Sequence, residues 1–152
     1  MSKGPDKMKL TKTSVHAALA VTFLADRPDD RPTQARQVGE HLGVPTDSAL
    51  KVLQALVRQN LLRSQLGRSG GYRLHTDPAD ISLLQIIEAI DGPIQAEVPG
   101  DGFADEASDH AVNALQAACD RSVHFLRSQL SAVTVADLID DASSEHGWAL
   151  AG

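Results

Sequence analysis

Hydrophobic positions recur at helical spacing along most of the chain. Between residues 13 and 25 apolar side chains occupy nearly every face, which predicts a helix buried between neighbouring elements. Two shorter amphipathic stretches follow, at residues 33–43 and 45–60. In the first of these, Thr33 is the expected N-cap and Gly43 the expected C-terminal stop. Two short helices joined by so tight a turn predict a helix-turn-helix.

The pattern then changes to the alternation of strands. In residues 61–75 two short runs flank a Gly-Arg-Ser-Gly-Gly sequence, whose glycines can supply the positive φ angles of a hairpin turn. Tyr72 and Leu74 fall on one face of the second strand. Leu62 and Leu66 are expected opposite to them on the first strand. Three helices followed by a hairpin are the element order of a winged helix.

A helix and a loop are predicted next. Residues 81–92 repeat apolar side chains at helical spacing, with Ser82 as the expected N-cap and Gly92 as the stop. Residues 93–109 are rich in proline, glycine and acidic residues, which predicts a flexible loop.

The last elements are a long helix, expected from about Asp109 to Leu130, and a short one. Thr134 is expected to cap the short helix, and the tail from Ser143 to fray. The apolar stripe of the long helix consists of Val112, Leu115, Cys119, Val123, Leu126 and Leu130.

Charge divides the chain into two unlike halves. Residues 1–75 carry twelve Lys and Arg against six Asp and Glu, a net charge of +6, whereas residues 76–152 carry two against fourteen, a net charge of −12. The two sum to the overall −6. A basic first half can approach phosphates, and an acidic second half is repelled by them.

Several classes of protein are disfavoured by what the sequence lacks. Its single cysteine, Cys119, excludes an intrachain disulfide and a cysteine zinc cluster. Residues 1–12 show no signal-peptide pattern, and the longest apolar stretch, residues 17–25, is too short for a membrane span. We therefore expect a cytoplasmic protein without a membrane partner. No nucleophile elbow, P-loop or HExxH pair is present, so we expect no enzyme.

Four landmarks now stand in one order: Met-Lys-Leu-Thr at residues 8–11, the helix-turn-helix, Gly-Arg-Ser-Gly-Gly-Tyr-Arg-Leu at 67–74, and the helix at 81–92. Together they closely resemble the bacterial winged-helix family that includes the iron–sulfur cluster regulator, the nitric-oxide-sensitive repressor and the cysteine-metabolism repressor. The resemblance is close over residues 8–92 and looser through the long helix.

The resemblance implies a mainly α fold with a small β-hairpin, in which a winged helix-turn-helix at 8–92 binds double-stranded DNA. It further implies an effector-type loop at 93–109, for an effector that the sequence does not identify, and a dimerisation region at 110–142. A homodimeric repressor would place the helix-turn-helix in the major groove of a palindromic operator and the wing on the minor groove. The stripe on the long helix would form the dimer.

Two departures from the family's pattern matter. Cluster-binding members carry three closely spaced cysteines in the loop before the long helix, and residues 93–109 contain none. A conventional iron–sulfur cluster is therefore excluded on ligand count, and no cofactor is expected. Members typically place an arginine directly before the first wing glycine, where this chain has Leu66.

The candidate DNA contacts are polar and positive side chains of the first helix, the helix-turn-helix and the hairpin. They are Lys9, Lys12, Arg36, Thr46, Asp47, Ser48, Lys51, Gln54, Arg58, Arg63, Arg68, Ser69 and Arg73. Thr46 or Asp47 is favoured as a helix cap over a base-reading residue. Arg68, beside glycines at the wing tip, is the strongest candidate for the minor groove.

Two alternatives stay open. A winged helix that has lost its operator would act as a protein-interaction module, and Asp47 and Leu66 at expected DNA-facing positions favour this interpretation. An atypical redox or metal sensor would use Cys119 with histidines in a site contributed by two subunits. The candidates are His16, His110 and His124. A packed Cys119 that acts as a small hydrophobe is favoured over that sensor.

Overall fold

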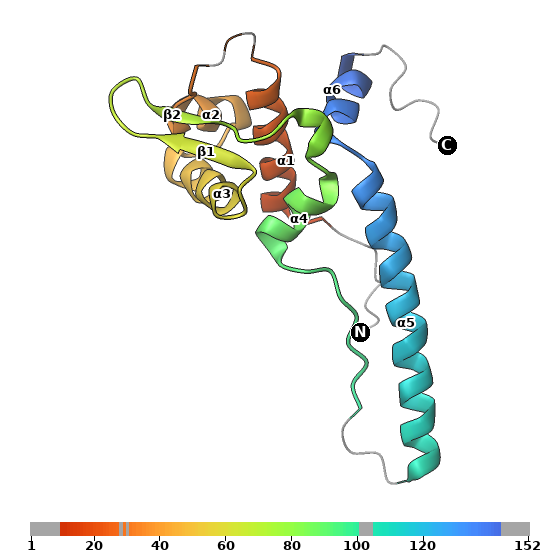
Figure 1. Ribbon diagram of the computed structural model, residues 1–152. Coiled ribbons are helices and arrows are strands. Elements are labelled where there is room, and N and C mark those ends of the chain that lie inside the picture. Colours follow the sequence, from red (N-terminus) through yellow and green to blue (C-terminus); the bar gives the residue numbers. More distant parts are fainter. Residues whose placement is uncertain (1–9, 28, 30, 101–104, 144–152) are drawn as a thin grey trace.

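The computed structural model describes residues 10–27, 29, 31–100 and 105–143. These residues form a mainly helical fold with one two-stranded antiparallel sheet, which confirms the predicted fold class (Figure 1). The elements are α1 (Lys12–Ala25), α2 (Ala35–Leu42), α3 (Thr46–Arg58), β1 (Leu62–Gln65), β2 (Gly71–Leu74), the 3₁₀ turn η1 (Pro78–Asp80), α4 (Leu83–Asp91), α5 (Glu106–Ala132) and α6 (Val135–Ser143).

Helix α1 is the centre of the core, as its all-round apolar pattern predicted. Ala17, Ala20 and Val21 are fully buried, and the helix contacts α2, α3, α4, α6 and β2. Small side chains let these neighbours approach α1 from several sides at once. The N-terminus of α1 is capped by Thr11, so the helix begins at Lys12, one residue earlier than predicted.

The helix-turn-helix forms from α2 and α3. Gly43 ends α2 with a φ of 67°, a conformation that favours glycine, so the predicted stop is confirmed. Two predicted caps are wrong. The N-cap of α2 is Gln34, and α3 starts at Thr46 itself after Pro45, so Thr46 and Asp47 lie inside its first turn.

Thr33 is not available as a cap because it pairs with the wing. Its backbone N–H donates to the Tyr72 carbonyl at 2.9 Å, and its carbonyl accepts from the Tyr72 N–H at 2.8 Å. This bridge fixes the hairpin to the start of α2. A Cβ at Gly71 would lie 2.4 Å from the Thr33 carbonyl oxygen, so the close approach requires glycine there.

The wing is a hairpin in which Leu62 pairs with Leu74 and Gln65 with Gly71. Tyr72 and Leu74 pack against the core, as predicted. The prediction that Leu66 shares this packed face is wrong. The strand ends at Gln65, and Leu66 lies in the turn with 94% of its surface exposed.

Helices α4, α5 and α6 begin where local N-capping residues place their first turns. Ser82 and Gln85 form a capping box at the start of α4, and Thr134 and Asp137 form the equivalent pair at α6, as Ser82 and Thr134 predicted. Helix α5 is longer than predicted, because Asp105 caps it one turn earlier than expected.

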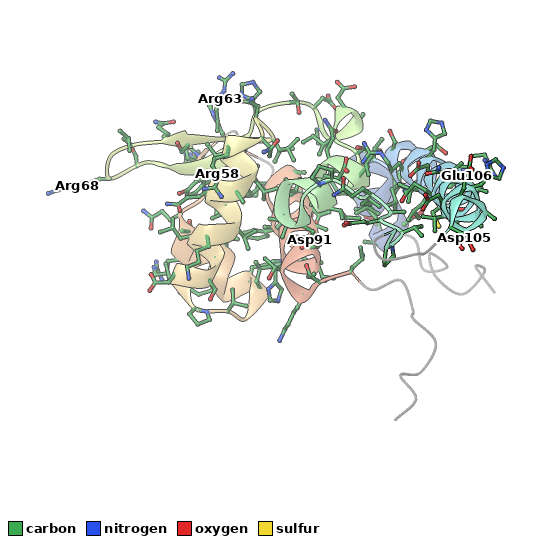
Figure 2. The ribbon with its side chains drawn as sticks, turned by 90° about the horizontal axis from the view of Figure 1, so that it is seen from below. Arg58, Arg63, Arg68, Asp91, Asp105 and Glu106 are labelled. Carbon is green, nitrogen blue, oxygen red and sulfur yellow. The ribbon has the colours of Figure 1, made fainter. Side chains whose placement is uncertain are left out.

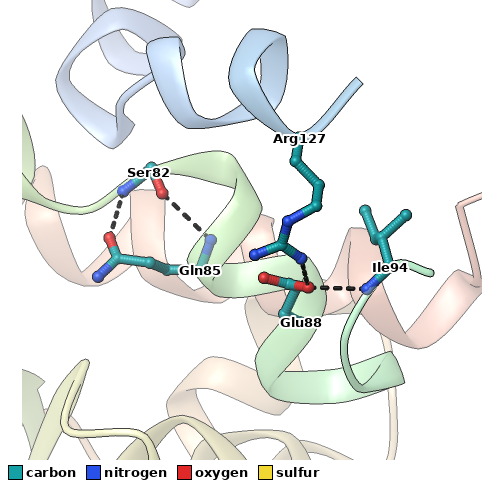
Figure 3. Close-up of polar contacts among 5 residues, drawn as sticks. All are labelled: Ser82, Gln85, Glu88, Ile94 and Arg127. Atoms are coloured by element: carbon teal, nitrogen blue, oxygen red, sulfur yellow. Dashed lines mark hydrogen bonds and ion pairs between the residues drawn. The ribbon is translucent and has the colours of Figure 1, made fainter. Parts of the chain in front are cut away.

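Residues 93–100 run extended beside α5 and are held to it and to α4 (Figures 1 and 3). The Ile94 N–H donates to Glu88 Oε2 of α4 at 2.7 Å, and Arg127 of α5 pairs with the same oxygen. Gln116 of α5 accepts from the Val98 N–H and donates to the Ala96 carbonyl, both at 2.9 Å. We call residues 93–100 the strap.

Candidate nucleic-acid interface

One side of α3 is fully available to a ligand. Ala49, Val52, Leu53 and Leu56 of this helix face the core and are buried. The opposite side carries all the α3 residues expected to contact DNA, and each is exposed. They are Thr46, Asp47, Ser48, Lys51, Gln54 and Arg58.

Three cations from two helices gather beside this face. Lys12 at the start of α1 and Lys51 and Arg58 of α3 line an open hollow of about 440 Å³, together with His16 and Ser48. Uncharged residues complete the lining among residues 10–27, 29, 31–100 and 105–143, so no carboxylate of these residues opposes the cations within it. We call this the basic hollow. It can accept a phosphate group, because Lys and Arg donors converge there in the absence of a competing anion.

A second hollow, of about 430 Å³, lies between α3 and the wing. Gln54 and Arg58 line it from α3, and Gln65 and Leu66 line it from the hairpin. Arg58 is therefore shared by both hollows. The exposed face of α3 and the side of the wing that faces α3 therefore form one continuous surface at Arg58.

The wing tip projects from the rest of the fold. Figure 2 shows Arg68 at its outermost point, and both Arg68 and Ser69 are exposed. Gln34 donates from Nε2 to the Arg68 carbonyl at 3.4 Å, and with Gln37 and Ser69 it lines a hollow under the tip. Gln34 was not among the predicted contacts, because its only signal in the sequence is its place beside Thr33, the expected cap.

Other predicted contacts lie away from this surface. Arg63 extends from the face of the hairpin opposite Arg58 and donates to Nδ1 of His75 at 3.0 Å (Figure 2). Its strand partner Arg73 lines a depression next to the 26–32 loop. Arg36 pairs with Glu40 along α2 at 2.7 Å. Lys9 lies outside the described residues.

Positive and negative charges occupy opposite ends of the molecule. Arg68 and Arg58 lie at the wing end, whereas Asp105 and Glu106 lie at the start of α5 (Figure 2). Hydrogen bonds from the side chain and backbone of Ser108 lower the pKa of Asp105, which favours its charged form. A polyanion is therefore attracted to the wing end and repelled from the other.

The predicted dimerisation stripe is divided between two environments. Within one chain Val112, Cys119, Val123, Leu126 and Leu130 are half-buried, and Leu115 is exposed. The exposed apolar side chains of α5 follow a neighbouring face, through Leu115, Ala118 and Phe125. No residue of this 27-residue helix is fully buried.

An apolar groove of about 630 Å³ lies across α1 and α6. Leu10, Val15 and Leu19 line its α1 side and remain exposed, and Leu138 and Ile139 line its α6 side. Together with the exposed face of α5, the groove leaves a large apolar surface in contact with solvent, which is unusual for a protein without a partner.

The candidate sensor residues do not form a ligand group within one chain. His16 lies in the basic hollow on α1, whereas His110 and His124 are exposed on α5, which also carries Cys119. Among the described residues no three His, Cys, Asp or Glu side chains are placed to hold a metal ion. In the same part of the chain, no helix is both long and apolar enough to cross a membrane.

The family model of Rrf2, described as an iron-dependent transcriptional regulator, matches residues 10–141. The chain belongs to the Rrf2 family. Its relatives include an HTH-type transcriptional regulator of Synechocystis, 32% identical over 90% of this chain and 91% of that protein. Another, from Mycobacterium tuberculosis, is 28% identical over 91% of this chain and 86% of the relative.

Solved structures share the fold of this Rrf2 protein. CymR, the global cysteine regulator of B. subtilis, superposes with a TM-score of 0.64 at 22% identity, over 88% of this chain and 98% of CymR. The T. potens IscR structure gives a TM-score of 0.62 at 20% identity, over 90% and 89% of the two chains. The predicted family resemblance is confirmed. The Rrf2 protein is a transcription regulator of the helix-turn-helix type and not an enzyme.

The donor atoms of this Rrf2 protein do not fit a thiolate-held iron–sulfur cluster, the conventional iron site of such regulators. A thiolate-held cluster requires several cysteines, and the whole sequence contains only Cys119. Residues 93–109, where cluster-binding members carry their cysteines, contain no cysteine. No step of the function proposed below therefore passes through iron.

Proposed function

We propose that this chain is a homodimeric repressor that binds a palindromic DNA operator and needs no iron–sulfur cluster to do so. The observation that carries the proposal is the basic hollow beside the exposed face of α3. Lys12, Lys51 and Arg58 anchor phosphates there, while the first turns of α3 reach base edges in the major groove. The projecting wing then reaches the adjacent minor groove with Arg68.

The exposed apolar surfaces support the dimer. Helix α5 is about 40 Å long at 1.5 Å per residue, and it exposes Leu115 and Phe125. A second copy of the chain would cover this face and the apolar groove. Dimerisation would thereby bury apolar side chains that are exposed to water in the monomer. Two-fold symmetry would then present two copies of α3 to two half-sites.

The strap supports regulation by an effector at residues 93–109. It connects through Glu88 to α4, and α4 packs against α1 and α3. Through Gln116 it also connects to α5. A ligand that displaces the strap would therefore act on both the DNA-binding and the dimerising parts of the molecule.

Selection of bound duplexes from a random DNA pool tests the proposal. The full chain should enrich a palindromic sequence, and its affinity should fall with salt by a log–log slope of about −0.9 for each phosphate neutralised. Light scattering of the same sample should give twice the 16.2 kDa mass of one chain. Lower expression of a reporter gene downstream of the enriched sequence distinguishes a repressor from an activator.

A protein-interaction module is the second candidate. The observation in its favour is Leu66, which is 94% exposed on the wing. The same selection separates the two, because a module without an operator enriches no DNA sequence even at low salt.

A further inference from the structure

Leu66 stands out among the exposed apolar side chains of the described residues. Its exposed fraction is 94%, against 65% for Phe125, the next highest. The Phe125 and Leu115 side chains lie on a helix face that a second copy can cover. Leu66 lies just after β1 on the projecting hairpin, where the rest of the chain covers almost none of its side chain.

The surroundings of Leu66 suit a polyanion. From Ser48 to Thr76 the sequence contains no acidic residue. The cations of this stretch that lie on α3 and at the wing tip are Lys51, Arg58 and Arg68. An apolar protein surface would have to approach Leu66 past these positive charges, whereas a DNA duplex is attracted by them.

Leu66 also lies on the correct side of the hairpin. It lines the hollow between α3 and the wing together with Gln54 and Arg58, so it lies on the same side of the molecule as these exposed residues of α3. It is two residues before Arg68, which occupies the wing tip (Figure 2). Any duplex that contacts both α3 and Arg68 therefore meets Leu66 between them.

We propose that Leu66 is an apolar wedge that enters the minor groove beside Arg68, partly unstacks one base step and bends the operator. The inference rests on the proposed DNA-binding function. A leucine cannot hydrogen-bond to the groove floor, and the apolar environment that DNA offers it is the space between base faces. Leucine wedges of this kind bend duplexes by about 20–90° toward the major groove. Pyrimidine–purine steps, which unstack most easily, are the expected sequence under the wing.

The test uses the full chain and a 30-base-pair duplex recovered with it from a random pool, with a fluorescent dye at each end. Energy transfer between the dyes reports the bend, and 2-aminopurine placed at successive steps reports unstacking. Wild-type protein should raise both signals. Leu66→Ala should lower the bend by more than half while the affinity falls by no more than about tenfold, the scale of one contact. Thr76→Ala, exposed at the foot of the hairpin, is the matched control and should bend the duplex as wild type does.

Folding does not complicate the comparison, since Leu66 is almost completely in solvent. Leu66→Arg adds a second test, because a cation there should retain binding and leave the duplex straight. A wild-type complex with a straight duplex, or an unchanged bend in Leu66→Ala, overturns the wedge and leaves the proposed function standing. Failure of wild-type protein to enrich any duplex overturns the proposed function, and the wedge with it.

Discussion

Arg58 is the residue that joins the parts of the candidate interface. It ends α3 and lines both the basic hollow and the hollow beside the wing. A phosphate between the two grooves of a duplex would lie against it. Arg58→Ala should therefore weaken operator binding by about 1–3 kcal/mol and lower the magnitude of the salt slope by about one phosphate equivalent. Titration by fluorescence anisotropy at several salt concentrations measures both.

Arg63→Ala is the control for this prediction. It removes the same charge from the same region, but Arg63 extends from the opposite face of the hairpin (Figure 2). The salt slope should stay close to that of wild type. Equal effects of the two substitutions would mean that total charge, and not the α3 surface, determines binding.

Asp91 holds the start of α1 in place from the end of α4. Its carboxylate accepts from the Ser14 hydroxyl, which is only 1% exposed, and from Thr11 Oγ1 at 3.0 Å. Asp91→Ala leaves the buried hydroxyl without this acceptor and should lower the free energy of unfolding by about 1–3 kcal/mol in urea titrations. Lys12 follows Thr11 in the chain, so operator binding should weaken as well.

Asp91→Asn separates hydrogen bonding from charge. The amide oxygen retains an acceptor for Ser14, so this variant should lose less than half the stability that Asp91→Ala loses. Identical losses in the two variants would indicate that the negative charge, and not the hydrogen bond, stabilises α1.

For individual residues, the sequence predicted exposure to solvent more accurately than it predicted the direction of each side chain. The polar face of α3 follows from helical spacing alone, and all six of its candidates are exposed. The opposite orientation of Arg63 follows from the strand alternation, since Leu62 beside it packs inward. Thr33 was mistaken for a cap because its pairing with Tyr72 is a tertiary contact with no local signal.

At the scale of elements, Glu88 ties α4 to α5 and to the strap (Figure 3). The Glu88 side chain is 19% exposed and that of Arg127 is 37% exposed, so water screens the ion pair only partly. Glu88→Ala should lower the free energy of unfolding by about 1–3 kcal/mol, because a charged hydrogen-bond partner is lost. Amide hydrogen exchange should accelerate at Ile94 by a larger factor than in α3, where only the lower global stability acts.

Glu97→Ala provides the matched control within the strap. It removes an exposed carboxylate and should leave the exchange at Ile94 as in wild type. Gln116→Ala should accelerate exchange at Val98, to which Gln116 is hydrogen-bonded, more than at Ile94. An acceleration in α3 as large as that at Ile94 in Glu88→Ala would indicate a purely global loss of stability and contradict a local tie.

The first turn of α5 should depend on pH through Asp105. Hydrogen bonds from Ser108 lower the pKa of its carboxyl in the folded chain. The charged cap therefore stabilises α5 fully above the ordinary aspartate pKa of about 4, and its contribution is lost as the pH falls through the lowered value. The protection of the Ser108 amide from exchange, relative to an unfolded peptide at the same pH, should fall over that range in wild type. In Asp105→Asn, which caps without titrating, this fall should be absent.

Element types and their order could be predicted because their signals are local. Helical periodicity, the caps Ser82 and Thr134 and the stop at Gly43 all act within a few residues. The strap could not be predicted, since Gln116 contacts backbone atoms of a segment about twenty residues earlier in the chain. Proline and acidic composition describes that segment as a loop but does not reveal which helix it lies against.

At the scale of the whole molecule, charge separates the two tasks of the chain. Cations gather at α3 and the wing, and carboxylates begin α5 at the other end (Figure 2). Apolar side chains are exposed between them, on α5 and along the groove of α1 and α6. A duplex is thus directed to one end, and a second copy of the chain has a largely apolar surface to cover.

Phe125→Glu should separate dimerisation from DNA recognition. Phe125 is 65% exposed, so a charge there should leave the fold and its circular dichroism intact but be too costly to bury between two copies. Light scattering should then report the mass of one chain. Because each copy keeps its own α3 and wing, the variant should bind a single half-site duplex as wild type does. On the palindrome only wild type should gain affinity, since linking two half-site contacts makes the second one intramolecular. Ala117→Glu adds the same charge on the polar side of α5 and should remain dimeric. Equal affinity of Phe125→Glu and wild type for the palindrome would mean that α5 does not join the two DNA-binding units.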